Sequence, residues 1–225
     1  MKESFLSFFP LLYLIIPAGF IIGSIPFGVL ATKNKGVDLR KTGSKNIGAT
    51  NVLRTAGKLP ALFTLAGDVF KGAVPVVICN YIIADISRTT GYSELISNAK
   101  DFWGGVAGLS AIAGHIFSIF LSFKGGKGVA TGLGVLLAYS PASAIIAISV
   151  WIAVAVITKY SSLAAIVAVA ALPVTFTMLD FSGIKIAFAI LFAILIISKH
   201  KENIKRLIAG KEPKIGDKKG IRDKG

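Results

Sequence analysis

Charged residues are scarce in this sequence, and their scarcity argues against a soluble protein. Only 16% of the 225 residues are charged, against about 25% in soluble domains, and 54% are hydrophobic. Apolar runs recur along nearly the whole chain and leave no room for a separate soluble domain. We therefore expect an all-α integral membrane protein, built as one bundle of helices with short loops.

Cysteine and acidic residues are too few for several kinds of site. The single cysteine, Cys79, lies inside an apolar run, which excludes a disulfide framework and a thiolate metal site. Asp68 is the one acidic residue well inside a predicted span, whereas a phosphoalcohol transferase needs clustered intramembrane aspartates to hold a divalent metal. We expect no metal and no cofactor.

Seven apolar segments are candidates for membrane-spanning helices, each judged against the roughly 20 residues of a full crossing. They lie near residues 10–31, 59–84, 102–122, 128–141, 142–158, 160–180 and 184–198. The stretch 128–158 forms either two short helices or one long helix, because residues 139–141, "YSP", are the sole turn signal within it.

The distribution of lysine and arginine favours two short helices. With seven spans, twenty of the 25 basic residues lie on one side of the membrane, whereas one long helix would separate the basic first loop from the basic tail. Basic residues collect on the cytoplasmic side, so we expect the N-terminus outside and the C-terminus in the cytoplasm. Their position beside the spans favours insertion topology and anionic lipid over nucleic acid as the reason for the net charge of +14. Residues 1–208 are the expected membrane domain, and residues 209–225 are an expected basic, flexible tail.

Polar residues gather beside the basic ones on the predicted inner face, which insertion topology alone does not explain. In residues 36–57, Ser44 is a candidate cap for a helix on which Asn46, Thr50 and Arg54 share a face, with Asn51 next to them. A helix start with free N–H groups, a hydroxyl and an arginine suits a phosphate. The alternative is an amphipathic surface helix, which would not favour so many amides.

A glycine-rich loop forms the second polar cluster. Gly125 and Gly126 would let the backbone approach a ligand and turn N–H groups toward it, while Lys127 adds a full charge. An ordinary basic loop is the alternative. The stretch is not a nucleotide P-loop, because Lys127 is followed by glycine and Leu121 stands at the first glycine position.

Two further inner clusters are "KYSSL" at 159–163 and "KHKENIKRL" at 199–207, where His200 and Asn203 can point the same way from a helix. A membrane-surface basic helix is the alternative for the latter. Asp68 and Lys71, spaced three apart in the second span, permit an ion pair, and His115 lies in the third span.

Together these segments resemble the bacterial acyl-phosphate:glycerol-3-phosphate acyltransferases, the PlsY family. The matching motifs are "GSIPFG" at 23–28, "DLRKTGSKNIGATNVLR" at 38–54, "GHIFSIFLSFKGGKGVAT" at 114–131, "KYSSL" at 159–163 and "HKENIKRL" at 200–207. The resemblance implies a seven-helix membrane enzyme that faces the cytoplasm. Such an enzyme moves a fatty acyl group from acyl phosphate to the 1-hydroxyl of glycerol 3-phosphate, giving lysophosphatidic acid.

The resemblance also implies roles for individual residues. Ser44, Asn46, Gly125 and Gly126 would serve the acyl-phosphate end, and Arg54, Lys127, His200, Asn203 and a serine of "KYSS", Ser161 or Ser162, would form the glycerol-phosphate pocket and reaction centre. Thr50 and Asn51 complete the expected substrate-binding set, and Arg54, Lys127 and His200 are the expected catalytic residues. The lipid bilayer is the expected partner, and the oligomeric state is left open.

Two other functions remain to be weighed against this one. An acyltransferase that uses acyl-CoA or acyl carrier protein through a His-x4-Asp pair is not supported, because Phe120 and Lys205 stand five residues after the two histidines. A membrane transporter of organophosphate anions would place polar groups near mid-membrane, whereas here they crowd one face.

Overall fold

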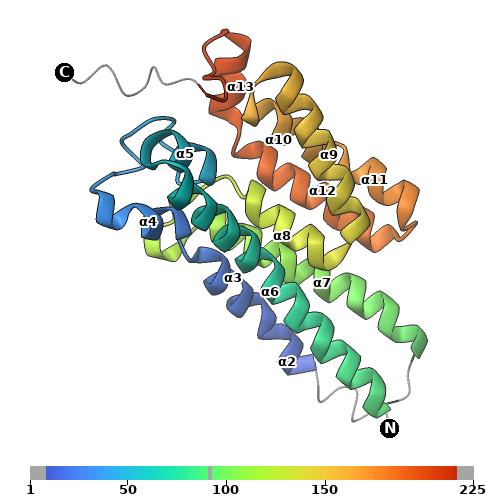
Figure 1. Ribbon diagram of the computed structural model, residues 1–225. Coiled ribbons are helices and arrows are strands. Elements are labelled where there is room, and N and C mark those ends of the chain that lie inside the picture. Colours follow the sequence, from blue (N-terminus) through green and yellow to red (C-terminus); the bar gives the residue numbers. More distant parts are fainter. Residues whose placement is uncertain (1–8, 91–92, 217–225) are drawn as a thin grey trace, which may run out of the picture.

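The computed structural model describes residues 9–90 and 93–216 and is all-helical over these ranges (Figure 1). The helices are α2 (Phe9–Tyr13), α3 (Ile15–Ser24), α4 (Phe27–Thr32), α5 (Ala49–Ala56), α6 (Lys58–Thr90), α7 (Ser93–Ile116), α8 (Val129–Tyr139), α9 (Pro141–Thr158), α10 (Ser161–Ala170), α11 (Leu172–Leu179), α12 (Gly183–Ser198) and α13 (Lys201–Ile208). Short 3-10 turns lie at Lys33–Lys35 and Ile119–Leu121.

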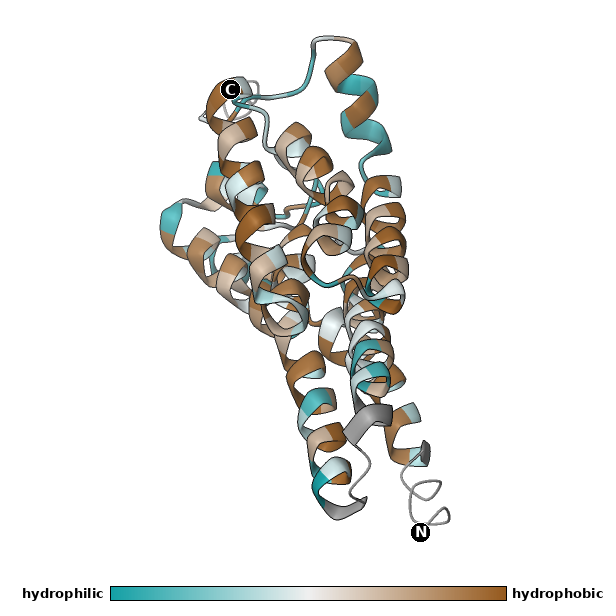
Figure 2. Ribbon diagram, turned by 90° about the vertical axis from the view of Figure 1, so that its right-hand side faces the viewer, coloured by the Kyte–Doolittle hydropathy of each residue, from teal (hydrophilic) through white to brown (hydrophobic). Residues whose placement is uncertain are grey.

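The predicted apolar segments are helical over most of their length, with breaks at Leu14, at Ile25 and Pro26 and at Ala171, and with α7 ending at Ile116 inside the third segment. Within residues 9–90 and 93–216, five helical segments are long and apolar enough to cross a membrane. The number rises to six if α12 and α13, which meet at a bend of 62°, are counted as one span. The apolar helix α8 is shorter, at 11 residues. Figure 2 shows mainly apolar residues along the long helices, whereas hydrophilic and apolar residues alternate along α13 at one end of the bundle. The described chain is therefore an all-helical protein of membrane-spanning type.

The stretch 128–158 consists of two helices, α8 and α9, which separate at Ser140. Pro141 occupies the first turn of α9, where its missing N–H costs nothing. Ser140 Oγ bonds Ser143 Oγ at 2.9 Å and Asp180 Oδ2 at 3.0 Å, so the break is held from both sides. Because α9 packs back against α8, the chain reverses here, as the lysine and arginine distribution predicts.

Close helix packing forms the centre of the bundle, where α6 and α7 contact α3 and α8. Glycine permits this approach: a Cβ on Gly134 of α8 would lie 1.9 Å from the carbonyl oxygen of Val69 in α6. A larger side chain there would force the two helices apart. This rigid centre supports α5 and the glycine-rich loop at one end of the molecule.

The first polar cluster folds differently from the expectation. Helix α5 begins at Ala49 with Gly48 as its N-cap residue, so Ser44 does not cap it and Asn46 lies outside it. The backbone N–H of Ser44 instead donates to Asn51 Oδ1 at 2.8 Å. Thr50 and Arg54 remain four residues apart on one helix and share a face, as predicted.

Candidate active site

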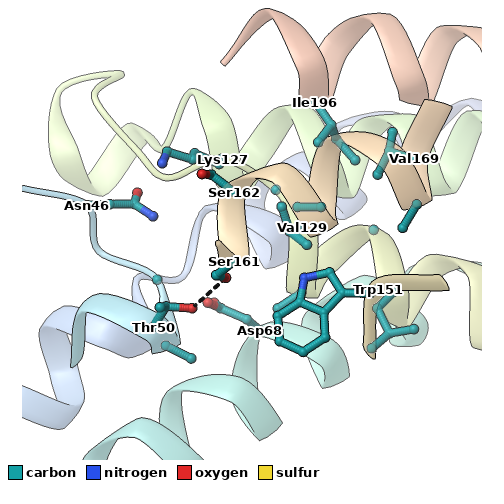
Figure 3. Close-up of a pocket in the computed structure, with 18 of the residues that line it drawn as sticks. Asn46, Thr50, Asp68, Lys127, Val129, Trp151, Ser161, Ser162, Val169 and Ile196 are labelled. Atoms are coloured by element: carbon teal, nitrogen blue, oxygen red, sulfur yellow. Dashed lines mark hydrogen bonds between the residues drawn. The ribbon is translucent and has the colours of Figure 1, made fainter. Parts of the chain in front are cut away.

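A cavity of about 630 Å³ lies at the end of the bundle that carries α5 and α13. Its polar lining consists of Ser44, Asn46, Thr50, Asn51, Arg54, Asp68, His115, Lys127, Ser161, Ser162, His200, Asn203 and Glu212. Its apolar lining includes Leu65, Leu133, Leu136, Ile148, Trp151, Val169, Leu172, Phe192 and Ile196. Figure 3 shows Asn46, Lys127 and Ser162 toward one end, with Trp151 and Val169 toward the other. All predicted site residues except Gly125 and Gly126 contribute to this lining.

Two cations face the cavity without a bonded counter-ion. Within residues 9–90 and 93–216, neither Arg54 nor Lys127 makes a side-chain hydrogen bond or ion pair. Burial lowers the pKa of Lys127 to about 8; Glu212 raises it, whereas the charges of Arg206 and Arg54 lower it. These two side chains are therefore available to hold an anion.

The glycine-rich loop positions Lys127 by packing against the end of α7. The N–H of Gly125 donates to Ile116 O at 3.1 Å, and that of Gly126 donates to His115 O at 3.0 Å. A Cβ on Gly126 would lie 2.2 Å from His115 Nε2. The expectation that these N–H groups turn toward a ligand is therefore corrected: both are used within the protein, and the glycines are needed because no side chain fits between loop and helix.

Asn51 organises the loop that precedes α5. Its Nδ2 contacts the carbonyl oxygens of Leu39, Thr42 and Asn46 at 3.2, 3.1 and 2.8 Å, and its Oδ1 accepts from Ser44 N. Both ends of the amide are thus used within the protein. This geometry favours a role in shaping the loop over the expected direct contact between Asn51 and substrate.

Thr50 and Ser161 link the two walls of the cavity. Their hydroxyl oxygens lie 3.3 Å apart, joining α5 to the start of α10 (Figure 3). Ser161 is thereby placed against Thr50, whereas the next residue, Ser162, turns toward a different partner.

That partner is Glu212, which the sequence analysis did not single out. Glu212 Oε1 accepts from Ser162 Oγ and from Asn203 Nδ2, each at 2.6 Å, and Oε2 accepts from Arg206 Nε at 2.7 Å. Burial raises the pKa of Glu212, but hydrogen bonds from these three residues outweigh it and lower the pKa overall.

The chain after α13 is bound to the bundle as far as it is described. Besides the contacts of Glu212, the N–H of Ile215 donates to Lys159 O at 2.7 Å, and Pro213 lines the cavity. Residues 209–216 make contacts that a flexible tail would not make, in contrast to the expectation for 209–225. Residues 217–225 lie outside the described ranges.

His200 is held in one orientation by the end of α12. Its Nδ1 lies 2.8 Å from Ile196 O, and since a carbonyl only accepts, Nδ1 carries the hydrogen. Burial lowers the pKa of His200; the bond to Ile196 and Glu212 raise it, whereas Lys127 lowers it. The ring is 2% exposed, and within the described residues nothing bonds its Nε2.

Asp68, Lys71 and His115 form a buried cluster beneath the glycine-rich loop. Lys71 Nζ lies 2.8 Å from Asp68 Oδ1 and donates to Ile25 O at 2.6 Å, and His115 Nδ1 lies 3.6 Å from Asp68 Oδ1. The ion pair expected from the spacing of Asp68 and Lys71 is present. Asp68 and His115 also line the cavity, a placement that their positions inside predicted spans did not indicate.

Comparisons with known proteins point to one family. The family model for glycerol-3-phosphate acyltransferase matches residues 13–210. Among curated relatives, the glycerol-3-phosphate acyltransferase of Geotalea daltonii is 40% identical over 88% of this chain and 94% of its own length. The glycerol-3-phosphate acyltransferase of Geobacter sulfurreducens is 43% identical over 86% of this chain and 92% of its own length.

Solved structures agree with these relatives. The glycerol 3-phosphate form of PlsY, an integral membrane glycerol 3-phosphate acyltransferase, superposes with a TM-score of 0.78 at 35% identity, covering 91% of this chain and 96% of that one. The lysophosphatidic acid form of PlsY superposes with a TM-score of 0.76 at 33% identity, covering 93% of this chain and 97% of that one.

Proposed function

The chain belongs to the glycerol-3-phosphate acyltransferase family, and on that premise we propose that it transfers a fatty acyl group from acyl phosphate to the 1-hydroxyl of sn-glycerol 3-phosphate. The products are lysophosphatidic acid and phosphate. The enzyme is thus a membrane acyltransferase of phospholipid synthesis.

One observation carries the proposal: a single cavity joins two cations, which have no bonded partner in the described part of the chain, to a long apolar wall. Both substrates bear a phosphate, and two anions at the edge of a low-dielectric region repel each other unless fixed positive groups face them. Arg54 and Lys127 supply such charges. Ser44, Asn46 and the start of α5 line the same end and suit the phosphate of the donor.

The apolar wall suits the acyl chain of the donor. It runs along α8, α9 and α10 from the polar end to Leu136 and to Leu172 at the start of α11. An acyl chain there is shielded from water while its carbonyl carbon stays at the polar end. Each buried CH₂ contributes about 0.8 kcal/mol, so this wall supports a lipid donor.

The reaction we propose is direct attack, because acyl phosphate is already an activated mixed anhydride. The 1-hydroxyl oxygen bonds the carbonyl carbon, the bond from that carbon to the phosphate oxygen breaks, and phosphate leaves with the electron pair. Lys127 and Arg54 stabilise the negative charge, and positioning supplies much of the remaining rate. No covalent intermediate on the protein is needed.

The proton of the hydroxyl passes either to His200 Nε2 or to an oxygen of the donor phosphate. The variant His200→Gln separates these routes, because loss of a general base lowers kcat by about 10²- to 10⁴-fold. Near-full turnover of His200→Gln assigns the proton to the phosphate instead.

We further propose seven membrane spans in the bacterial cytoplasmic membrane, with the N-terminus outside and the cavity facing the cytoplasm. The supporting observation is the basic excess on the side that carries the cavity. Since Cys79 is the sole cysteine, cysteines introduced one at a time at Lys45 and Lys185 in a Cys79→Ala background test the orientation. A membrane-impermeant maleimide should label position 185 but not position 45 in intact cells, and the reverse pattern contradicts the proposal.

The donor is tested with purified protein, labelled glycerol 3-phosphate and either palmitoyl phosphate or palmitoyl-CoA. Lysophosphatidic acid should form with palmitoyl phosphate and not with palmitoyl-CoA. Product formed only from palmitoyl-CoA would leave the acyltransferase activity in place and overturn the acyl-phosphate donor.

A further inference from the structure

Glu212 can only accept hydrogen bonds at neutral pH, and this restricts its partners. Its pKa is lowered overall by the three groups that donate to it, despite the opposing effect of burial, so the carboxylate stays ionised. Both oxygens are occupied, Oε1 by Ser162 and Asn203 and Oε2 by Arg206. Each partner must therefore turn a hydrogen toward it.

For Ser162 this consumes the only hydrogen of the hydroxyl. Ser162 Oγ lies 2.6 Å from Glu212 Oε1 and is the donor in that bond. A hydroxyl carries one donor and two acceptor positions. Ser162 is consequently left with acceptor capacity alone for any ligand in the cavity it lines.

For Asn203 the carboxylate decides which way the amide faces. Its Nδ2 lies 2.6 Å from Glu212 Oε1, and reversing the amide would set two acceptor oxygens against each other at that distance. Its Oδ1 is buried and, among the described residues, has no hydrogen-bond partner. This buried oxygen is the remaining acceptor of Asn203, a residue that lines the cavity.

His200 follows the same rule, although a different partner imposes it. Because Nδ1 donates to Ile196 O, Nε2 is the acceptor nitrogen. The polar end therefore contains acceptors from Ser162, Asn203 and His200, and cationic donors from Arg54 and Lys127. Phosphate oxygens need the donors, whereas hydroxyl groups can satisfy the acceptors.

We propose that Glu212 is a positioning residue that makes Ser162 and Asn203 hydrogen-bond acceptors, so that they select an acceptor substrate by its hydroxyl groups rather than by its phosphate. The inference rests on the proposed function and deepens it: glycerol 3-phosphate places its hydroxyls on the acceptor side and its phosphate on Arg54 and Lys127. A phosphomonoester with fewer hydroxyls leaves a buried acceptor without a partner.

The probe is 3-hydroxypropyl phosphate, which keeps the phosphate and the attacking hydroxyl and lacks the 2-hydroxyl. A site built to pair a hydroxyl rejects an analogue without it, because the buried protein group then stays unpaired. We expect the wild-type protein to prefer glycerol 3-phosphate by about tenfold to hundredfold in kcat/KM and in binding without acyl donor. Equal use of both compounds by the wild type would overturn the proposal whatever the variants do.

The variant is Glu212→Gln, and its matched control is Glu202→Gln on the exposed face of α13. A glutamine at 212 can present its NH₂ to Ser162 and Asn203, which frees the serine hydrogen and lets the asparagine amide reverse. We expect this variant to prefer glycerol 3-phosphate over 3-hydroxypropyl phosphate by no more than about threefold in kcat/KM, because the pairing described above is lost. Glu202→Gln should keep the wild-type ratio, since among the described residues the carboxylate of Glu202 bonds Lys205 alone, at 3.4 Å.

Inorganic phosphate distinguishes positioning from general structural damage. At a pH of about 6.5, below the pKa of Lys127, removing the charge of Glu212 should leave phosphate binding unchanged or tighter. Equal weakening of phosphate and of both substrates would mean that Glu212 only holds the fold, and would overturn the inference.

Two further readouts keep the test decisive. If Glu212→Gln does not fold, Ser162→Ala should reduce the preference for glycerol 3-phosphate, because it removes one acceptor, and an unchanged ratio counts against the proposal. If the wild-type protein binds glycerol 3-phosphate selectively but acylates it neither from acyl phosphate nor from acyl-CoA, the proposed function is refuted and the inference about Glu212 is not.

Discussion

Lys127 is a single charge on which the site depends, since it faces the cavity with no bonded carboxylate among the described residues. A partly buried ammonium without a counter-ion is costly, and its pKa falls for that reason. The same free-energy cost makes the ammonium an effective anion ligand, because a bound phosphate supplies the missing counter-ion.

The pH dependence of the reaction follows from this pKa. Because the pKa of Lys127 is lowered to about 8, its charge is present below that pH and is lost above it. We expect kcat/KM for glycerol 3-phosphate to decline as the pH rises through about 8, measured as initial rates from pH 6 to about 10. Lys127→Arg should remove the decline, since arginine stays protonated throughout this range.

The matched control for that profile is Lys124→Ala, which changes an exposed lysine of the same loop. It should keep both the rate and the alkaline decline, whereas Lys127→Ala should abolish turnover in a folded protein. A decline that persists unchanged in Lys127→Arg assigns the titration to another group.

Short motifs predicted residues that line the cavity, whereas a residue placed there by a distant contact was missed. Lys127, Ser162 and Asn203 were predicted by the motifs that contain them, and all three line the cavity. Glu212 lies 50 residues from Ser162 in a stretch rich in lysine, proline and glycine, which resembles a solvated tail. Its contacts arise only when the chain after α13 folds back.

At the scale of elements, the segment before α5 depends on one amide. Asn51 is 1% exposed and joins three carbonyls and one N–H of residues 39–46. A serine before a polar helix is a common cap signal, which explains the expectation for Ser44. The signal misled because Asn51, inside the helix, bonds the preceding turn, so that the helix starts only at Ala49 with Gly48 as its N-cap.

Replacing Asn51 should therefore destabilise the segment before α5. Asn51→Ala leaves several buried backbone groups without their partner, and we expect a loss of about 1 to 3 kcal/mol in stability. Thermal unfolding in detergent measures it, with Asn34→Ala, an exposed asparagine on the preceding turn, as control. Equal melting temperatures for the two variants would contradict the organising role of Asn51.

The glycine-rich loop gives a second element-scale prediction. Because a Cβ on Gly126 would meet His115 Nε2 at 2.2 Å, Gly126→Ala must shift the loop and with it Lys127. We expect activity to fall by about tenfold or more, in keeping with the sensitivity of rates to misplacement of about 1 Å. Gly183→Ala, where no atom lies within 4 Å of the added Cβ, is the control.

A double variant tests the cause. His115→Ala opens the space that the new methyl group needs, so Gly126→Ala should cost less activity in that background than in the wild type, a coupling between neighbouring residues. Additive losses would mean that the clash with His115 is not the reason for the defect.

At the scale of the whole molecule, an apolar chain places its polar chemistry at one end. Composition was sufficient to predict an all-helical membrane protein, and the polar clusters that the lysine and arginine distribution groups on one face line one cavity. Length alone could not define the spans, because α8 has 11 residues and α12 bends by 62° into α13. Short and bent helices satisfy their backbones against neighbouring helices, and that packing has no local sequence signal.

The depth of the cavity predicts how long an acyl chain the protein accepts. Ala168 lines the wall six residues after Ser162 on α10, which at 1.5 Å per residue is about 9 Å from the polar end. Ala168→Phe fills the cavity at that depth. We expect kcat/KM for palmitoyl phosphate to fall by at least about tenfold, because a loss of about 0.8 kcal/mol of burial per methylene reaches that factor after only two of the methylenes beyond this point.

Octanoyl phosphate, which ends near that depth, should be used within about twofold of the wild-type rate, since its chain forfeits little burial. Ala153→Phe, on the exposed face of α9 and outside the cavity lining, controls for an added ring at the membrane surface and should leave the chain-length profile unchanged. The comparison uses a series of acyl phosphates at a fixed concentration of glycerol 3-phosphate.

Because both substrates meet at the polar end, a changed dependence of kcat/KM on chain length, with an unchanged KM for glycerol 3-phosphate, places the acyl chain along α10. An equal loss for every chain length would instead mean that the ring distorts the polar end.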